Sequence, residues 1–305
     1  MMSPTKNESP VVSVIIPTHN RAILVCRAIS SVLSQTYGDL ECIVVDDGST
    51  DSTTQAVAAI SDPRLTYIRH EQSRRASAAR NTGIRSAKGK YIAFLDDDDE
   101  WYPQKLQLQV EFIENCPETI GMVYCWMDYF SGNEKINEHH PSLKGNVFRY
   151  VLDKQAIGGC PTLLVRREVV EQVGGFDESL PRGNDGDFIR RVCRDYEVDF
   201  VPKVLVKVNV DHGHERISQE NRNGIINGIN SQKDKLEKFR KELEKYPVQK
   251  ANILSHIGCG YGMLGEYRES ISWFSKALRT APYSRNVYLG MMRVIKRTLS
   301  GGQVS

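Results

Sequence analysis

The feature that most constrains this chain is the segment Tyr91–Trp101, in which an apolar run ends in four consecutive aspartates. The run from Tyr91 to Leu95 is too short for a helix and rich in aromatic and branched residues, so it predicts a fully buried strand. The aspartates then lie at the carboxyl end of that strand, where open α/β sheets hold their ligands. Adjacent carboxylates repel one another unless a positive group joins them. The segment predicts a site for a divalent cation and a phosphate-bearing ligand, and a solvated acidic loop is the alternative.

Strand-like and helix-like segments alternate through the first part of the chain. Buried strands are expected at 11–16, 40–45 and 65–69, with helical periodicity at 21–35 and 77–87. Asn20 is expected to cap the first helix, and residues 131–141 are expected to form a polar loop. The alternating order is typical of a parallel sheet covered by helices. The predicted fold class is therefore α/β, with a mixed, mostly parallel sheet.

Composition excludes several classes of protein. The 305 residues are 40% apolar and 26% charged, which is ordinary for a globular protein, and the net charge of +2 implies no nucleic-acid partner. The seven cysteines are scattered without a C-x-x-C pair, so reduced thiols are expected. Residues 1–10 are polar and lack the core of a signal peptide; they are predicted to be disordered. A cytoplasmic protein is expected, with peripheral attachment to the inner face of the membrane left open.

The composition changes after residue 220, which predicts a domain at 11–220 and a helical extension at 221–305. Within the extension, residues 251–282 resemble one tetratricopeptide repeat, through the small residues Gly258 and Gly262, the Leu264-Gly265 turn and Pro282. Such repeats normally bury one another's faces in arrays of about three copies. A single copy indicates packing on the rest of the chain, self-association, or docking of a protein partner.

Several segments of the predicted α/β domain together resemble glycosyltransferase family 2, whose fold is called GT-A. They are VSVIIPTHNR at 12–21, ECIVVDDGSTDST at 41–53, AARNTGIRSAKGKYIAFLDDDDEWYPQKL at 78–106, GGFDESL at 174–180 and NDGDFIRRV at 184–192. The resemblance covers roughly residues 11 to 218 and depends on the order of the segments, because each one alone is weak.

The resemblance implies a nucleoside-diphosphate sugar as the donor. The loop after the first strand, with Pro17, Thr18 and Asn20, would hold the nucleotide base, and Asp47 would accept a hydrogen bond from it. A carboxylate acceptor suits uracil or guanine, and a UDP-sugar is favoured. Arg80 would face the donor phosphates, and an exposed arginine that pairs with an acidic neighbour is the alternative.

The resemblance also implies a divalent metal, Mn²⁺ or Mg²⁺, on the donor diphosphate. Asp96-Asp97-Asp98 matches the family's D-x-D motif, with Asp97 near the ribose, Asp98 as a metal ligand and Asp96 beside it. A metal offsets the charge that develops on the leaving diphosphate. His212 is the expected third ligand, with His214 as an alternative.

Asp185 is the expected catalytic base, because it matches the family's base carboxylate just before a helix. A base takes the proton from the acceptor hydroxyl as that oxygen attacks the sugar. One carboxylate opposite the leaving group implies direct displacement and inversion. The family often has Glu-Asp here, whereas this chain has Asn184-Asp185; Asp187 is the alternative base.

The resulting hypothesis is an inverting, metal-dependent transfer of a sugar to a hydroxyl of a glycan or lipid-linked acceptor, in cell-surface polysaccharide synthesis. A sugar nucleotidyltransferase is one alternative, although PTHNR at 17–21 lacks the glycine-rich basic loop that such enzymes usually have. A non-catalytic nucleotide-binding scaffold with a partner-binding tail is the other.

Overall fold

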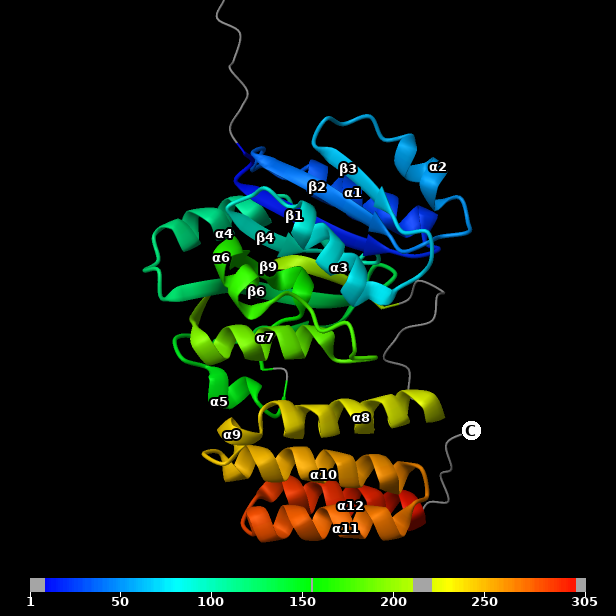
Figure 1. Ribbon diagram of the computed structural model, residues 1–305, viewed down its shortest axis with the longest axis vertical. Coiled ribbons are helices and arrows are strands. Elements are labelled where there is room, and N and C mark those ends of the chain that lie inside the picture. Colours follow the sequence, from blue (N-terminus) through cyan, green and yellow to red (C-terminus); the bar gives the residue numbers. More distant parts are fainter. Residues whose placement is uncertain (1–8, 155, 211–220, 300–305) are drawn as a thin grey trace, which may run out of the picture. The chain divides into compact units, whose positions relative to one another are not determined.

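The computed structural model describes residues 9–154, 156–210 and 221–299 (Figure 1). These residues form two compact units. The sheet unit contains residues 9–148, 156–178 and 188–210, and the helical unit contains 149–154, 179–187 and 221–299. Neither unit is a continuous stretch of chain.

Nine strands form one sheet within the described part of the sheet unit, in the order β3-β2-β1-β4-β8-β6-β9-β5, with β7 on β6. Their bounds are β1 Val12–Thr18, β2 Leu40–Asp46, β3 Leu65–Arg69, β4 Tyr91–Phe94, β5 Glu100–Trp101, β6 Ile120–Ser131, β7 Glu134–His139, β8 Leu164–Arg166 and β9 Glu197–Asn209.

The first half of the sheet is parallel and places three loops at one edge. β1 pairs with both β2 and β4, and Thr18 lies beside Asp46 in the register. The carboxyl ends of these strands therefore meet, as parallel pairing requires. β8 then runs antiparallel to β4, and β9 runs parallel to β6. The mixed α/β fold predicted from the sequence is confirmed.

Helices cover the sheet of this unit (Figure 1). They are α1 Ala22–Leu33, α2 Thr53–Ala58, α3 Arg75–Ser86, α4 Lys105–Glu114, α6 Arg167–Val173 and α7 Asn184–Asp195, with a short 3-10 helix at Cys160–Thr162. Helix α3 lies very close to β1, because a Cβ on Gly83 would be 2.4 Å from the Ile15 side chain. The strand residues beneath are fully buried, as the continuous apolar runs predict.

The structure contradicts the loop that the sequence predicts at 131–141. Residues 131–141 are not a loop, because β6 continues to Ser131 and returns through Gly132 into β7. The side chains of β7 are mostly exposed, so the strand carries no apolar alternation. Backbone pairing with β6 holds it in place instead.

The helical unit is built from α8 Arg222–Lys238, α9 Arg240–Leu243, α10 Pro247–Met263, α11 Tyr267–Thr280 and α12 Arg285–Leu299. It also includes all of α5, Phe148–Val151, except the first residue, which counts with the sheet unit. Gly258 of α10 lies against the ring of Phe274 of α11, which holds these two helices close together. No helix in the described ranges combines the length and apolarity that spanning a bilayer requires.

Two segments from earlier in the chain, 149–154 and 179–187, form side-chain contacts with these helices. Asn252 of α10 donates to the buried carboxylate of Asp153 at 2.6 Å. Lys238 of α8 forms an ion pair with Asp187 at 2.8 Å, and Asp187 is 4% exposed. The helical unit thus includes the first turn of α7.

Candidate active site

Three carboxylates gather in the loop that follows β4. Single oxygen atoms of Asp96, Asp98 and Asp99 lie within 4.8 Å of one another. Asp99 is buried, whereas Asp96 and Asp98 are partly exposed. Hard divalent cations prefer such oxygen ligands, so the donor set suits Mg²⁺ or Mn²⁺. The structure brings Asp96 and Asp98 together as predicted and adds Asp99 to them.

Asp97 points to the neighbouring strand β1 and not to this cluster. Its carboxylate accepts a hydrogen bond from the Thr18 hydroxyl at 2.8 Å and pairs with the Arg21 guanidinium at 2.7 Å. Burial raises the pKa of Asp97, and the nearby charge of Arg21 offsets only part of that effect. Asp97 therefore connects the aspartate loop at 96–99 to the end of β1 and the loop that follows it.

Two arginines supply positive charge to the aspartates. Arg21 reaches Asp98 at 3.2 Å in addition to Asp97, and Arg80 of α3 lies 2.5 Å from Asp96. Burial lowers the pKa of Arg21, but Asp97 and Asp98 raise it further, to a value above the ordinary one. Arg80 also lies over the ring of Phe176, 5.3 Å from its centroid. Both guanidiniums are thus within reach of any anion bound at the cluster.

The end of β9 closes the loop from the other side. The main-chain N–H of Asn209 donates to Asp99 at 3.2 Å, and its side-chain amide donates to the carbonyl oxygen of Asp98 at 3.0 Å. Arg27 of α1 donates to the same carbonyl at 2.8 Å. These bonds fix the backbone that carries the aspartates.

Asp46 and Asp47 have different roles at the end of β2. Asp46 is fully buried and accepts hydrogen bonds from the Ser49 N–H at 2.8 Å and from the Tyr67 hydroxyl, so it shapes the turn. Asp47 is bound by the loop before α3, through the Ser73 hydroxyl at 2.7 Å and the Arg75 N–H at 2.7 Å. Burial raises the pKa of Asp47, but these hydrogen bonds outweigh it and the pKa lies below its usual range.

The loop after β1 connects to the Asp47 turn through Asn20. The Asn20 side chain accepts a hydrogen bond from the Thr50 N–H at 2.7 Å, and its own N–H donates to the Ser49 hydroxyl at 2.8 Å. Its φ of 53° is in the left-handed region, which asparagine tolerates. Asn20 is therefore not the cap of α1 as expected; Arg21 occupies the N-cap position. Pro17 lies in β1, beside Val45.

Asp185 lies in the first turn of α7 and is partly exposed. In the same turn Asp187 is buried and forms the ion pair with Lys238. An anion in the first turn is favoured by the helix dipole. The contacts of Asp187 make it a structural carboxylate, which leaves Asp185 as the more accessible of the two.

An aromatic cluster fixes the direction of α7. The ring of Phe176 stacks on Phe188 of α7 at 4.8 Å and meets Phe94 of β4 edge-on at 5.1 Å. Asn81 of α3 holds the backbone of Phe176 with two hydrogen bonds of 2.8 Å, one to its carbonyl oxygen and one from its N–H. The Gly174-Gly175-Phe176 turn therefore has a structural role.

Three features of the site were missed in the sequence, and one prediction cannot be placed. Arg21 and Asn209 carry no distinctive sequence signal, and Asp99 stands just outside the D-x-D match at 96–98. The Arg21 position directly after Asn20 in PTHNR was the only available clue. His212, like His214, lies outside the described residues, so its contact with a metal stays a prediction.

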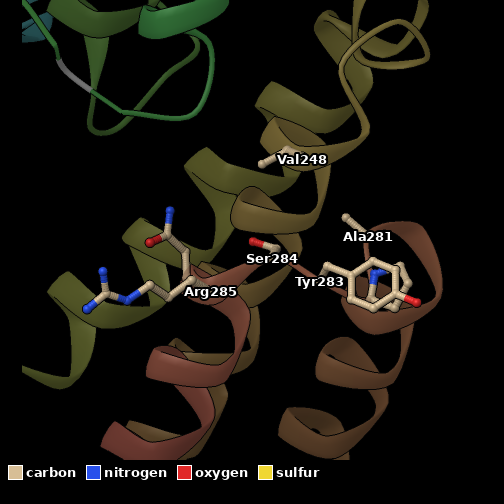
Figure 2. A pocket seen from close by; sticks show the side chains of 7 residues that line it. Val248, Ala281, Tyr283, Ser284 and Arg285 are labelled. Atoms are coloured by element: carbon tan, nitrogen blue, oxygen red, sulfur yellow. The ribbon is translucent and has the colours of Figure 1, made fainter.

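An open pocket of about 390 Å³ lies elsewhere, in the helical unit, where α11 leads into α12 (Figure 2). Its lining is formed by Val248, Ala281, Pro282, Tyr283, Ser284, Arg285 and Asn286. These side chains include one cation and neither a carboxylate nor an imidazole. The lining therefore lacks a general base.

Comparisons with known proteins agree with this geometry. The family described as "Glycosyl transferase family 2" matches residues 13–174, a range that includes the aspartate loop and ends before Asp185. Relatives from Rickettsia species that are named uncharacterized glycosyltransferases are 30–34% identical, and the match spans between 32% and 74% of their length.

Two relatives from Escherichia coli have more specific names. The putative colanic acid biosynthesis glycosyl transferase WcaA of strain K12 is 30% identical over 79% of this chain and 88% of its own. The UDP-Glc:alpha-D-GlcNAc-diphosphoundecaprenol beta-1,3-glucosyltransferase WfgD is 42% identical over 34% of this chain and 41% of its own.

The fold also matches a solved structure. S. aureus TarS (residues 1–349, in complex with UDP-GlcNAc) superposes with a TM-score of 0.69 at 17% identity, over 95% of this chain and 92% of that one. The family match covers more than half of the chain, and it decides against a nucleotidyltransferase or a non-catalytic scaffold. This chain is a glycosyltransferase of the GT-A fold and belongs to glycosyltransferase family 2.

Proposed function

We propose that this protein is an inverting, metal-dependent glycosyltransferase that moves a sugar from a UDP-sugar to a hydroxyl of a glycan or lipid-linked acceptor, in the synthesis of a cell-surface polysaccharide. The observation that carries the proposal is the cluster of Asp96, Asp98 and Asp99 at the end of β4, with Arg21 and Arg80 beside it. Carboxylates for a cation and guanidiniums for a diphosphate are both needed to bind a sugar nucleotide.

Asp98 and Asp96 would hold the divalent ion, with Asp99 as a further ligand or support. GT-A transferases commonly use such an ion, and when bound it offsets the negative charge of the leaving diphosphate. Arg80 would move from Asp96 to a phosphate oxygen as the cation arrives. Asp97 would meet the ribose, since the Thr18 bond directs it toward the loop after β1.

Pro17, Thr18 and Asn20 would form the floor beneath the nucleotide base, and Asp47 would accept from its ring N–H. The Asp47 oxygens already receive protein donors, so the base has to displace one of them. The Ser73 hydroxyl, unlike the N–H groups of Arg74 and Arg75, can rotate away without moving the backbone. The names of WfgD and of the TarS complex support a uridine nucleotide.

Asp185 would be the base that removes the proton from the acceptor hydroxyl. The acceptor oxygen then forms a bond to the anomeric carbon while the bond to the diphosphate breaks on the opposite face, so the configuration inverts. Because Asp187 is buried and held in an ion pair with Lys238, it is less accessible to an acceptor hydroxyl than Asp185. The names of WcaA and WfgD support a polysaccharide or a lipid-linked acceptor.

A thermal-shift panel with UDP, GDP, dTDP and CDP, each with and without Mn²⁺, tests the donor site. We expect a metal-dependent rise in Tm with UDP, since a ligand at a hundredfold excess over Kd adds about 2.7 kcal/mol of stability. Asp98→Asn should abolish the metal dependence, whereas the exposed Glu118→Gln should keep it. A chain that responds to none of the four nucleotides contradicts the proposal.

Transfer assays with Asp185→Asn and Asp187→Asn test the base. We expect Asp185→Asn to lower kcat by about 10²- to 10⁴-fold while the UDP-dependent thermal shift is kept. Asp187→Asn should lower Tm more than kcat, because it removes the ion pair with Lys238. An active Asp185→Asn enzyme, or a product that retains the donor's anomeric configuration, would rule out this mechanism.

A further inference from the structure

Helix α12 has an exposed apolar stripe that runs along its whole length. The exposed fractions are 47% for Tyr288, 56% for Met292, 55% for Ile295 and 83% for Leu299. These residues are spaced by three or four positions, so they lie one above another on one face of the helix. Leu289 adjoins the stripe and is 41% exposed. An apolar face of this length is typical of an interaction surface.

A different face of α12 attaches the helix to its own unit. Val287 is fully buried, and Gly290 lies close to Ser255 and Phe274, where a Cβ would be 2.6 Å from the serine hydroxyl. Val294 packs against the same core cluster. Because this face already holds the helix, the exposed stripe is not needed for packing within the unit.

The charge of α12 indicates what the stripe contacts. The helix contains four basic residues, Arg285, Arg293, Lys296 and Arg297, and its sequence from 285 to 299 has no aspartate or glutamate. Lys296 lies one helical turn from Met292, and Arg293 one turn from Leu289, so positive charge borders the stripe. The chain as a whole has a net charge of only +2, which makes this helix distinctly basic.

We propose that α12 binds to an anionic lipid surface through this stripe. An amphipathic helix with aromatic and aliphatic residues on one face and lysine or arginine beside it lies in the plane of a bilayer interface. Tyrosine is enriched at the interface between lipid and water, and Tyr288 and the 96% exposed Tyr283 are suited to that position. Tyr283 and Arg285 stand at the start of the helix, in the pocket of Figure 2.

A second copy of the chain is a less suitable partner for the stripe than an anionic lipid surface. Symmetric pairing through this stripe would bring two basic helices together, and like charges across an interface weaken association. A bilayer with anionic headgroups has the opposite charge and gains about 1 kcal/mol for each basic residue near its surface. The inference does not need the proposed reaction, since it concerns only where the protein resides.

Flotation of the full chain with vesicles tests the inference. Vesicles of phosphatidylcholine alone are compared with vesicles that also contain phosphatidylglycerol. We expect binding to the anionic vesicles only, weakened by added salt. Ile295→Asp should reduce the binding at least tenfold, because a carboxylate enters the apolar face. Ile136→Asp on β7, where the isoleucine is 52% exposed, should change it little.

Two double variants that remove the same number of positive charges measure the electrostatic contribution to vesicle binding. Arg293→Gln with Lys296→Gln should weaken the binding about fivefold for each charge removed. Lys241→Gln with Lys245→Gln removes the same charge from exposed sites outside α12 and should have a smaller effect. Unchanged Tm values show that each variant is folded.

Three outcomes would overturn the inference. They are no flotation with anionic vesicles, equal flotation with neutral vesicles, and light scattering that shows a dimer which Ile295→Asp dissociates. Because the nucleotide thermal shift is measured on the same samples, a chain that binds UDP without binding lipid separates this inference from the proposed function.

Discussion

Arg21 contacts Asp97 and Asp98 in the structure, at the position where a cation would bind. A guanidinium and a divalent ion would compete for the same carboxylate oxygens, so the arginine would have to leave Asp98 for the proposed metal to bind there. The Arg21 side chain is 19% exposed and is long enough to bind a diphosphate held beside the aspartates. Arg21 therefore stabilises the aspartate loop when no cation is bound.

We expect Arg21→Gln to lower Tm without metal and to raise the affinity for Mn²⁺ in the absence of nucleotide by about tenfold, which corresponds to 1.4 kcal/mol. Removal of the guanidinium leaves carboxylates that repel one another until a cation binds. Calorimetric titration with Mn²⁺ measures the change. Arg27→Gln is the control, because Arg27 binds the carbonyl oxygen of Asp98 and not its carboxylate. Equal effects of the two variants would contradict this account.

Lys105 makes the stability of the protein depend on pH through a single side chain. Its ammonium is fully buried, lies 3.8 Å from the ring centroid of Trp101 and donates to Gln109 at 2.7 Å. Burial lowers the pKa of Lys105 from 10.5 to about 8. The folded protein thus binds this proton less tightly than the unfolded chain does. The stability contributed by Lys105 rises from about pH 8 to pH 10.5 and is lost as the pH falls.

Denaturant unfolding of the wild type and of Lys105→Met over this pH range tests the effect. From pH 8 to pH 10.5, the free energy of unfolding of the wild type should rise by up to about 3 kcal/mol relative to that of the variant. The figure follows from about 1.36 kcal/mol for each unit by which the pKa is lowered. Groups that titrate in both proteins cancel in the difference. Parallel pH profiles would show that Lys105 keeps its ordinary pKa.

At the scale of elements, the turn Gly174-Gly175-Phe176 aligns α3, β4 and α7. Gly175 has a φ of 69°, and a Cβ there would be 2.6 Å from the Asn81 side-chain oxygen that holds Phe176. Gly174 has a φ of 83° but no neighbour within 4 Å. The two glycines thus share a backbone conformation and differ in their surroundings.

Gly174→Ala should cost about 1–2 kcal/mol, the left-handed penalty alone. Gly175→Ala should cost clearly more, because it also displaces Asn81 from Phe176. Urea denaturation of both variants gives the difference, and an equal loss would show that the Asn81 contact contributes nothing.

The sequence predicted elements well where a residue pattern reflects one physical cause. The apolar run 91–95 could only be buried as a strand, and its aspartates therefore had to stand at the sheet edge. The β6–β7 hairpin was missed because β7 is held by backbone bonds, which polar side chains do not reveal. The ion pairs of Arg21 could not be predicted for a related reason, and neither could the identity of Asp96 as the acidic partner of Arg80. An arginine's partner depends on which strands become neighbours, and local sequence does not encode that.

At the scale of the whole molecule, Lys238 connects a helix near the end of the chain to the first turn of α7. We expect Lys238→Met to lower the free energy of unfolding by about 1–3 kcal/mol, since it removes the ion pair between Lys238 and the buried Asp187. It should also lower kcat while the UDP-dependent thermal shift is kept, because the same turn carries Asp185. Lys238→Arg should restore both quantities, and Lys241→Met serves as the exposed control. Full activity of Lys238→Met would show that the ion pair has no influence on Asp185.

Helix α7 belongs to both units: its first turn, with Asp185, counts with the helical unit and the remainder with the sheet unit. A genetic exchange that replaced residues 221–305 alone would separate Lys238 from Asp187 and Asn252 from Asp153. A working chimera between two relatives therefore has to transfer three separate stretches, 149–154, 179–187 and the C-terminal helices. Recombination at a single crossover cannot do this, so the two units are expected to be inherited and to diverge as a pair.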